Sequence, residues 1–175
     1  MLDRLPEYID PIQLAEKRGE LKGKIPLSEL GRLADGLQND AGFVEVSLFF
    51  SKEGRLAKID GQIKSEIELQ CQNCLNAVTW VVDSNVKLGI VTSIDAANRL
   101  PEDYDPLIVA TEEKRLLKDI IEDELILALP DFPKHQHDCL AEKISLSKTD
   151  SFSEPHSTRE NPFAILAKLK ITGDQ

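Results

Sequence analysis

The longest regular pattern in the chain is an alternation of apolar and polar residues between positions 57 and 71. Polar side chains fall on even positions and apolar ones on odd positions; the apolar set is Ala57, Ile59, Ile63, Ile67, Leu69 and Cys71. A period of two is that of a β-strand with one buried and one solvated face. The sequence therefore predicts one long strand here, with a bend or bulge near Gly61.

Similar alternations precede and follow this segment. The earlier one has its apolar side chains at Val44, Val46, Leu48 and Phe50, and the later one at Val78, Trp80, Val82, Val86, Leu88 and Ile90. Residues 52–55 (KEGR) have the composition of a turn. Three consecutive strands joined by short turns predict an antiparallel β-meander with one solvated face.

The segment before the strands has a helical pattern. Asp10 followed by Pro11 provides an N-cap and a first-turn proline for a short helix. A second helix is predicted from Pro26, with apolar residues at helical spacing that we expect in the core: Leu27, Leu30, Leu33, Ala34 and Leu37. Gly36 and residues 39–42 would end it.

A longer helix is predicted after an acidic loop at residues 93–106 and a short strand at 107–109. Its apolar stripe consists of Leu116, Leu117, Ile120, Ile121, Leu125 and Ala128, and Pro130 ends it. The opposite side carries Lys118, Asp119, Glu122 and Asp123. Such a side is either solvated or an acidic docking surface.

Residues 145–160 are rich in Ser, Thr and Glu and offer almost nothing to bury. We expect one α+β domain over residues 1–144, a disordered linker over 145–160, and a short C-terminal helix with its tail over 161–175. The amphipathic helix (NPFAILAKLK) could pack on the core or serve as a recognition peptide for a partner. The predicted fold is thus a β-meander with N-terminal helices, one long helix after the sheet and a short C-terminal helix.

Composition narrows the range of functions. No apolar run approaches the about 20 residues that span a bilayer, and the N-terminus lacks the features of a secretory signal, so we expect a cytoplasmic protein. The net charge is −10, and the chain has no basic block. Direct binding of RNA or DNA usually relies on such a block. A basic protein partner is therefore favoured over a nucleic acid.

Two of the three cysteines, Cys71 and Cys74, are separated by two residues at the predicted tip of a hairpin. A redox pair at this spacing normally opens a helix, whose dipole lowers the thiol pKa, and no helix is predicted to begin at Cys74. Half of a metal site fits the hairpin better. The odd number of cysteines argues against a disulfide framework.

The second half of such a site could come from the KHQHDC stretch. Cys139 with either His135 or His137 would complete a Cys3His set, for which Zn²⁺ is the favoured ion. The alternative is that the thiols are small buried side chains and the histidines belong to a polar loop. No catalytic constellation accompanies these residues: the sequence has no Gly-rich phosphate loop, no G-x-S-x-G and no His-rich metal motif of an enzyme. We therefore expect no enzymatic activity and no small-molecule substrate.

Five stretches occur in an order that resembles one bacterial family: CQNC, LPEDYDPL, IEDELILALP, HQHDC and NPFAILAKLK. From about Leu5 to Lys170 the chain is similar to the YceD family of large ribosomal RNA subunit accumulation proteins. The resemblance implies an α+β domain and a role in the synthesis, processing or accumulation of 23S ribosomal RNA. It implies no catalytic residues.

Three hypotheses follow from these features. The first is a ribosome-biogenesis factor whose partners are ribosomal proteins or other assembly factors, with contact to rRNA indirect. The second is a direct RNA-binding module that uses a local basic face: Lys17, Arg18, Lys22 and Lys24. The third is a thiol-disulfide oxidoreductase.

Overall fold

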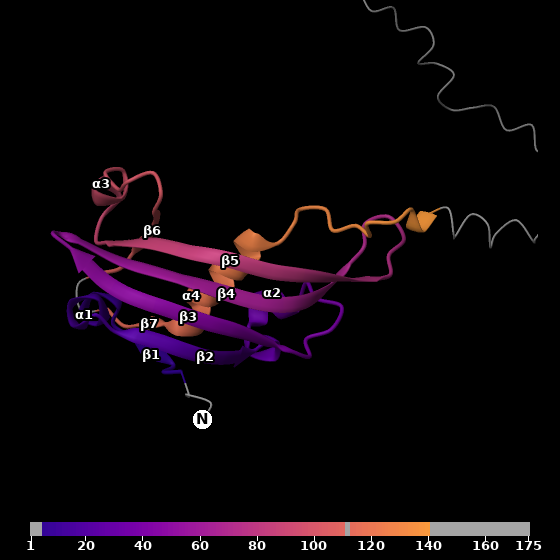
Figure 1. The fold of residues 1–175 in the computed structure, drawn as a ribbon, viewed down its shortest axis with the longest axis horizontal. Helices are drawn as coiled ribbons and strands as arrows, with labels where there is room; N and C mark the ends of the chain where they lie inside the picture. Colours follow the sequence, from indigo (N-terminus) through magenta and orange to yellow (C-terminus); the bar gives the residue numbers. More distant parts are fainter. Residues whose placement is uncertain (1–4, 111–112, 141–175) are drawn as a thin grey trace, which may run out of the picture. The chain divides into compact units, whose positions relative to one another are not determined.

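The computed structural model describes residues 5–110 and 113–140, and its main element is a five-stranded sheet in the order β2-β3-β4-β5-β6 (Figure 1). Neighbouring strands from β2 to β5 are antiparallel, and β6 pairs in parallel with the end of β5. The strands are β2 (Glu20–Pro26), β3 (Phe43–Glu53), β4 (Leu56–Gln70), β5 (Ala77–Val91) and β6 (Asp105–Ile108). The predicted α+β class and the β3-β4-β5 meander are confirmed.

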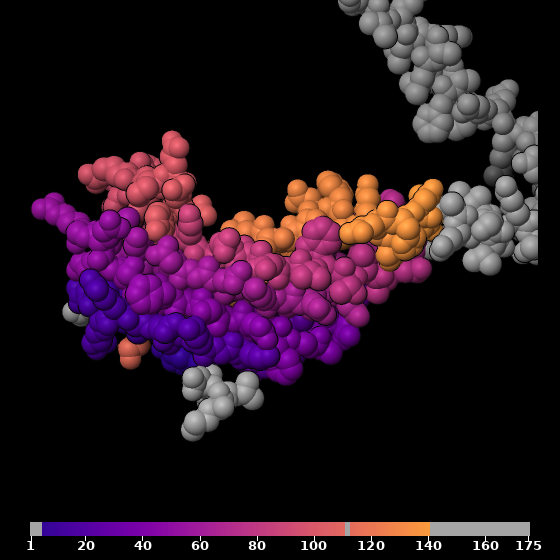
Figure 2. Space-filling view, viewed as in Figure 1, coloured from indigo at the N-terminus to yellow at the C-terminus, as the bar shows by residue number. Residues whose placement is uncertain are grey.

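The longest helix of the described chain, α4 (Leu117–Ala128), packs across one face of this sheet (Figure 1). The other helical elements are short: α1 (Pro11–Lys17), the 3-10 turn η1 (Leu27–Glu29), α2 (Gly31–Ala34) and α3 (Ile94–Ala97). A two-stranded antiparallel pair joins β1 (Tyr8–Ile9) to β7 (Arg115–Leu116). Within the described residues, the helices leave the opposite face of the sheet uncovered, and Figure 2 views the molecule from that face (Figure 2).

The core lies between the sheet and α4, and the alternation of the strands decides which side chains enter it. The predicted apolar positions of β3 and β4 are buried, and so are those of β5 except Trp80, which is half-buried. Leu117, Ile120, Ile121 and Leu125 of α4 are buried against them. Side chains return to the same face every two residues in a strand and every 3.6 residues in a helix. Each element therefore contributes to the core through a single apolar face.

The predicted caps of the first helix are confirmed. Asp10 accepts a hydrogen bond from the Gln13 N–H at 2.9 Å, and Pro11 occupies the first turn of α1. The predicted helix from Pro26 is wrong in extent. Leu27, Leu30 and Leu33 are buried as expected and Leu37 is partly buried. However, Leu30 leaves the helical region (φ −97°, ψ 83°) and Gly31 follows, so only η1 and the four-residue α2 form.

Two further features differ from the predictions. Residues 20–26, which precede that helix, form the strand β2, which adds to the sheet next to β3. Of the bend or bulge predicted near Gly61, the bulge is absent, since β4 keeps an uninterrupted register with both neighbours. Gly61 instead allows β3 to approach closely. An added Cβ would lie 2.7 Å from Leu48 Cδ2 and 3.0 Å from Leu48 Cα.

Glu122 of α4 differs from the prediction that its side of the helix is solvated. It is 4% exposed, and one of its carboxylate oxygens accepts the Leu33 N–H at 3.0 Å. Arg32 Nε donates to the other oxygen at 2.8 Å, and Arg32 Nη1 reaches Asp123 at 2.7 Å. Glu122 and Asp123 therefore connect α4 to α2, and both carboxylates are paired with Arg32.

The predicted linker (145–160) and C-terminal helix (161–175) lie outside the described residues, as does the end of the predicted 1–144 domain. Among the residues that the structure does describe, no helix is both long enough and apolar enough to cross a membrane.

Candidate metal centre

The tip of the β4-β5 hairpin holds Cys71 and Cys74 in a tight turn. Cys71 directly follows β4; its N–H donates to the Asn76 carbonyl and its carbonyl accepts the Leu75 N–H, both at 2.9 Å. Leu75 adopts a left-handed conformation (φ 63°) that reverses the chain. Cys71 continues the buried phase of β4, and both thiols point inward, with 0% and 2% of their surfaces exposed.

The segment that follows α4 brings the second half of the cluster to this tip. The Gln72 N–H donates to the Pro133 carbonyl at 2.8 Å, which fixes the returning chain against the hairpin. Cys139 is then buried beside Cys71, with 3.8 Å between their sulfurs. Nδ1 of His135 lies 3.5 Å from the Cys74 sulfur. Residues some sixty positions apart in the sequence therefore meet at one point.

The four ligand atoms form a compact group in which no separation exceeds 4.8 Å. In a tetrahedral zinc site the Zn–S bonds are about 2.3 Å and the Zn–N bonds about 2.0–2.1 Å, so two sulfurs lie about 3.8 Å apart and a sulfur and a nitrogen about 3.6 Å apart. The Cys71–Cys139 and Cys74–His135 distances match these values. The donor set thus fits a four-coordinate metal ion.

A second contact orients the imidazole of His135. Its Nε2 lies 3.1 Å from the Ala77 carbonyl oxygen, to which it donates in the tautomer that leaves the Nδ1 lone pair free. Histidine ligands commonly donate their other ring nitrogen in this way. The His137 ring lies next to that of His135, with 4.8 Å between centroids and a tilt of 40°, but His137 is exposed and is not one of the four clustered residues. Of the two histidines that the sequence offered, the structure groups His135 with the cysteines.

The electrostatics of the turn favour one thiolate. Burial raises the pKa of the Cys71 thiol, but N–H groups of Cys74, His135 and Asn73 outweigh it and lower that pKa to about 5. Burial, together with the neighbouring Cys74 and Cys71 sulfurs, raises the pKa of the Cys139 thiol to about 11. Ionising all three thiols together would place three negative charges in this space, and a bound cation would compensate them.

The arrangement suits structure better than catalysis. Four protein donors leave no open position for a water or a substrate, whereas catalytic zinc sites keep one. None of Cys71, Cys74 and Cys139 is in a disulfide, and the 3.8 Å between the Cys71 and Cys139 sulfurs is far from the about 2.05 Å of an S–S bond. Because the thiols are almost fully buried, a substrate protein could not reach them.

Comparison with known proteins places the chain among bacterial relatives. A family described as "Large ribosomal RNA subunit accumulation protein YceD" matches residues 59–170, which include all four clustered residues. A protein of Haemophilus influenzae with the same description is 30% identical over 168 residues, which cover 95% of this chain and 97% of the relative. No solved structure matches the chain significantly.

Proposed function

Because this chain belongs to the YceD family of large ribosomal RNA subunit accumulation proteins, we propose that it is a cytoplasmic ribosome-biogenesis factor needed for the synthesis, processing or accumulation of 23S ribosomal RNA. The observation that carries this proposal is the match to the family's relative over 95% of the chain. It acts without catalysis and through protein partners, namely ribosomal proteins or other assembly factors of the large subunit. Its contact with rRNA is indirect.

The charges of the described chain support the protein-partner mechanism over direct RNA binding. The lysines of β2, which would form much of a basic face, are already paired: Lys22 with Glu20 at 2.5 Å and Lys24 with Glu45 at 2.6 Å. Lys17 donates to the side chain of Gln13. A face whose cations are neutralised by neighbouring carboxylates releases few counterions from phosphates, and counterion release supplies most nonspecific RNA affinity.

Deletion of the gene tests the cellular role. We expect the deletion strain to accumulate less mature 23S rRNA relative to 16S rRNA, measured by electrophoresis of total RNA from cells grown at normal and at low temperature. Expression of the intact protein from a plasmid should restore the ratio. An unchanged ratio at both temperatures would contradict the proposal.

We also propose that Cys71, Cys74, His135 and Cys139 hold a structural Zn²⁺ ion. The donor set and its spacing support zinc, which prefers tetrahedral thiolate and imidazole ligands. The ion would cross-link the hairpin tip to the segment after α4 and so contribute to folding. Elemental analysis of protein purified without a histidine tag should find about one zinc per chain; less than about a tenth would mean that the thiols only pack.

A further inference from the structure

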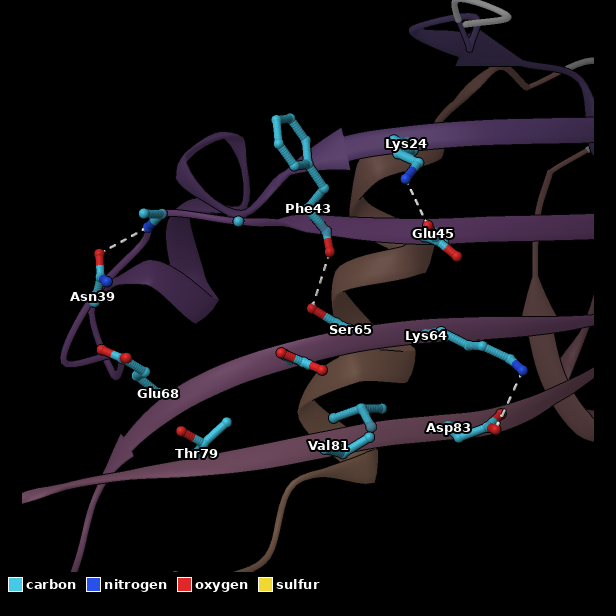
Figure 3. A pocket seen from close by; sticks show the side chains of 14 residues that line it. Lys24, Asn39, Phe43, Glu45, Lys64, Ser65, Glu68, Thr79, Val81 and Asp83 are labelled. Carbon is cyan, nitrogen blue, oxygen red and sulfur yellow. Dashed lines mark hydrogen bonds and ion pairs between the residues drawn. The ribbon is translucent and has the colours of Figure 1, made fainter.

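The open face of the sheet carries a groove of about 640 Å³ that crosses β2 to β5 (Figure 3). Most of the residues that line it come from the solvated phase of the four strands and from the loop before β3. It lies on the face that α4 leaves uncovered and contains none of the four clustered metal-ligand candidates. Neither the hairpin tip nor the family's description accounts for it.

One side of the groove is a row of charges that neutralise one another. Lys24, Glu45, Lys64 and Asp83 lie opposite each other on β2, β3, β4 and β5, and Figure 3 shows them in that order (Figure 3). Lys24 pairs with Glu45 at 2.6 Å, and Lys64 with Asp83 at 3.4 Å. This row has no net charge and so does not attract either sign of ligand.

Two carboxylates beyond this row are left without partners. Glu66 and Glu68 follow Lys64 on the same face of β4, opposite Val81 and Thr79 of β5. Within the described residues, neither carboxylate makes an ion pair or a side-chain hydrogen bond. Residues two apart on a strand are about 6.5–7 Å apart and point the same way. The groove thus presents two parallel, uncompensated negative charges.

Apolar side chains flank these carboxylates. Phe43 at the start of β3 is 58% exposed and Val81 on β5 is 67% exposed, and both line the groove. A long basic side chain combines the two properties found here, since its methylene stem covers apolar surface while its charged head pairs with a carboxylate. The face of the Phe43 ring offers a further favourable contact for a cation.

We propose that this groove binds an extended arginine- or lysine-rich segment of a partner protein, with basic residues at every second position facing Glu66 and Glu68. This inference rests on the proposed function, because it specifies the chemistry of the protein partner through which the factor acts. Basic residues two apart in an extended segment have the same spacing as the two carboxylates. An RNA strand does not suit the groove, because its phosphates would meet the unpaired carboxylates. A second copy of this acidic chain does not suit it either.

A direct binding assay tests the groove. The probe is a fluorescein-labelled peptide that alternates arginine with valine over eight residues, and its anisotropy is followed as full-length protein is added at about 50 mM NaCl. We expect the Glu66→Gln/Glu68→Gln variant to bind at least about tenfold more weakly than the wild type, because two charge-assisted hydrogen bonds are lost. A peptide with citrulline in place of arginine should bind the wild type as weakly as the arginine peptide binds the variant.

A matched variant controls for overall charge. Glu102→Gln/Asp103→Asn removes two charges from the exposed loop before β6, outside the groove, and should change the affinity less than about twofold. Both double variants should keep the wild-type melting temperature, since the side chains are not buried. Equal affinities of the wild type and the Glu66/Glu68 variant, or equal losses in the two variants, would overturn the proposal.

Two other occupants give distinct results. Single-stranded RNA that used the groove would bind the Glu66→Gln/Glu68→Gln variant more tightly than the wild type, since phosphate repulsion would fall. A second copy would appear as self-association of the wild type that the variant loses, measured by sedimentation. Either result would overturn the proposal.

Complementation separates this inference from the proposed function. In the deletion strain, the loop variant should restore the ratio of 23S to 16S rRNA and the groove variant should not. If the wild type restores the ratio and the groove variant restores it equally well, the groove assignment is wrong and the role in rRNA accumulation stands. If the deletion leaves the ratio unchanged, the cellular role fails independently of the peptide measurement.

Discussion

At the scale of single residues, His135 and His137 show how much a backbone contact decides. They are two positions apart and have the same side chain, but only His135 lies in the four-residue cluster. The contact between its Nε2 and the Ala77 carbonyl holds the ring with Nδ1 toward Cys74. The two histidines should therefore respond differently to substitution.

His135→Ala should reduce the zinc bound to tag-free protein to well below half an equivalent, because three donors hold the ion less tightly than four. His137→Ala is the matched control and should keep about one equivalent, because His137 is exposed and outside the cluster. Elemental analysis of both variants measures the difference. Equal zinc contents in the two variants would mean that His135 is not a ligand.

Removal of the ion should weaken the fold, because binding a structural metal is coupled to folding. If the site contributes about 3 kcal/mol, a strong chelator should lower the melting temperature by about 6–12 °C. Cys71→Ser should melt at a similarly reduced temperature and should show no further decrease on chelation. A wild-type melting temperature that is insensitive to chelators would indicate that the cluster contributes only by packing.

At the scale of elements, one contact joins two helices and another joins two strands. Arg32 and the Leu33 N–H of α2 hold Glu122 of α4, and Gly61 lets β3 and β4 approach closely. Both contacts join segments that are distant in the sequence. Their stability effects can be measured separately because they share no residues.

Glu122→Gln should destabilise the protein by about 1–3 kcal/mol at neutral pH, because a buried charge-assisted hydrogen bond is lost. Burial raises the pKa of Glu122, but the Leu33 N–H and Arg32 outweigh it and hold that pKa below 4.5. The stability from this carboxylate is therefore complete above pH 4.5 and is lost as the pH falls through the lowered folded-state value. Urea unfolding of both proteins as a function of pH should show the difference shrink in acid.

Glu124 on the same helix provides a control, because its pKa is shifted in the opposite direction to that of Glu122. Burial raises its pKa, and the neighbouring Asp105 and Asp123 raise it further, so its ionised form opposes folding at neutral pH. Glu124→Gln should therefore leave the free energy of unfolding unchanged or increase it. A loss similar to that of Glu122→Gln would show that the two carboxylates are not distinguished by their surroundings.

Gly61→Ala should destabilise the protein by about 1–3 kcal/mol, because the added methyl group would overlap Leu48 and the backbone of β3. Gly31→Ala is the matched control: it meets nothing within 4 Å and lies in a helix, where alanine is favoured. Thermal unfolding of the two variants measures the contrast. A neutral Gly61→Ala would mean that β3 and β4 can separate at little cost.

At the scale of the whole molecule, charge is the dominant property. The chain carries −10, and the paired lysines of β2 do not present a free basic face. Burial of the thiols likewise disfavours the oxidoreductase alternative, and we expect the protein to be inactive in an insulin-reduction assay. These charges support the proposed basic protein partners over nucleic acid.

Purified protein should therefore bind 23S rRNA fragments weakly, with no binding tighter than about 10 µM at low salt. A filter-binding or anisotropy titration at two salt concentrations measures this. Tight binding that weakens steeply with salt would favour the RNA-binding alternative. Lys17→Ala/Arg18→Ala would then test whether the N-terminal basic residues are responsible.

The sequence by itself determined the elements whose signals are local. The period of two in β3, β4 and β5 and the apolar stripe of α4 each lie within one segment, and the Asp10-Pro11 cap needs only neighbouring residues. It also predicted a Cys3His set, because C-x-x-C on a hairpin needs further ligands and few candidates remain downstream. The strand β2 was missed although Leu21, Gly23 and Ile25 alternate with charged residues, because its short apolar phase includes a glycine.

Only the tertiary structure decided the features that join distant segments. It placed His135 beside Cys74 and Glu122 against Arg32, and it gathered the groove around Glu66 and Glu68 from four strands. A sequence pattern states which face of an element is apolar, but not which other element covers that face. That choice depends on strand register and on contacts between residues far apart in the chain, which form only when the whole core is packed.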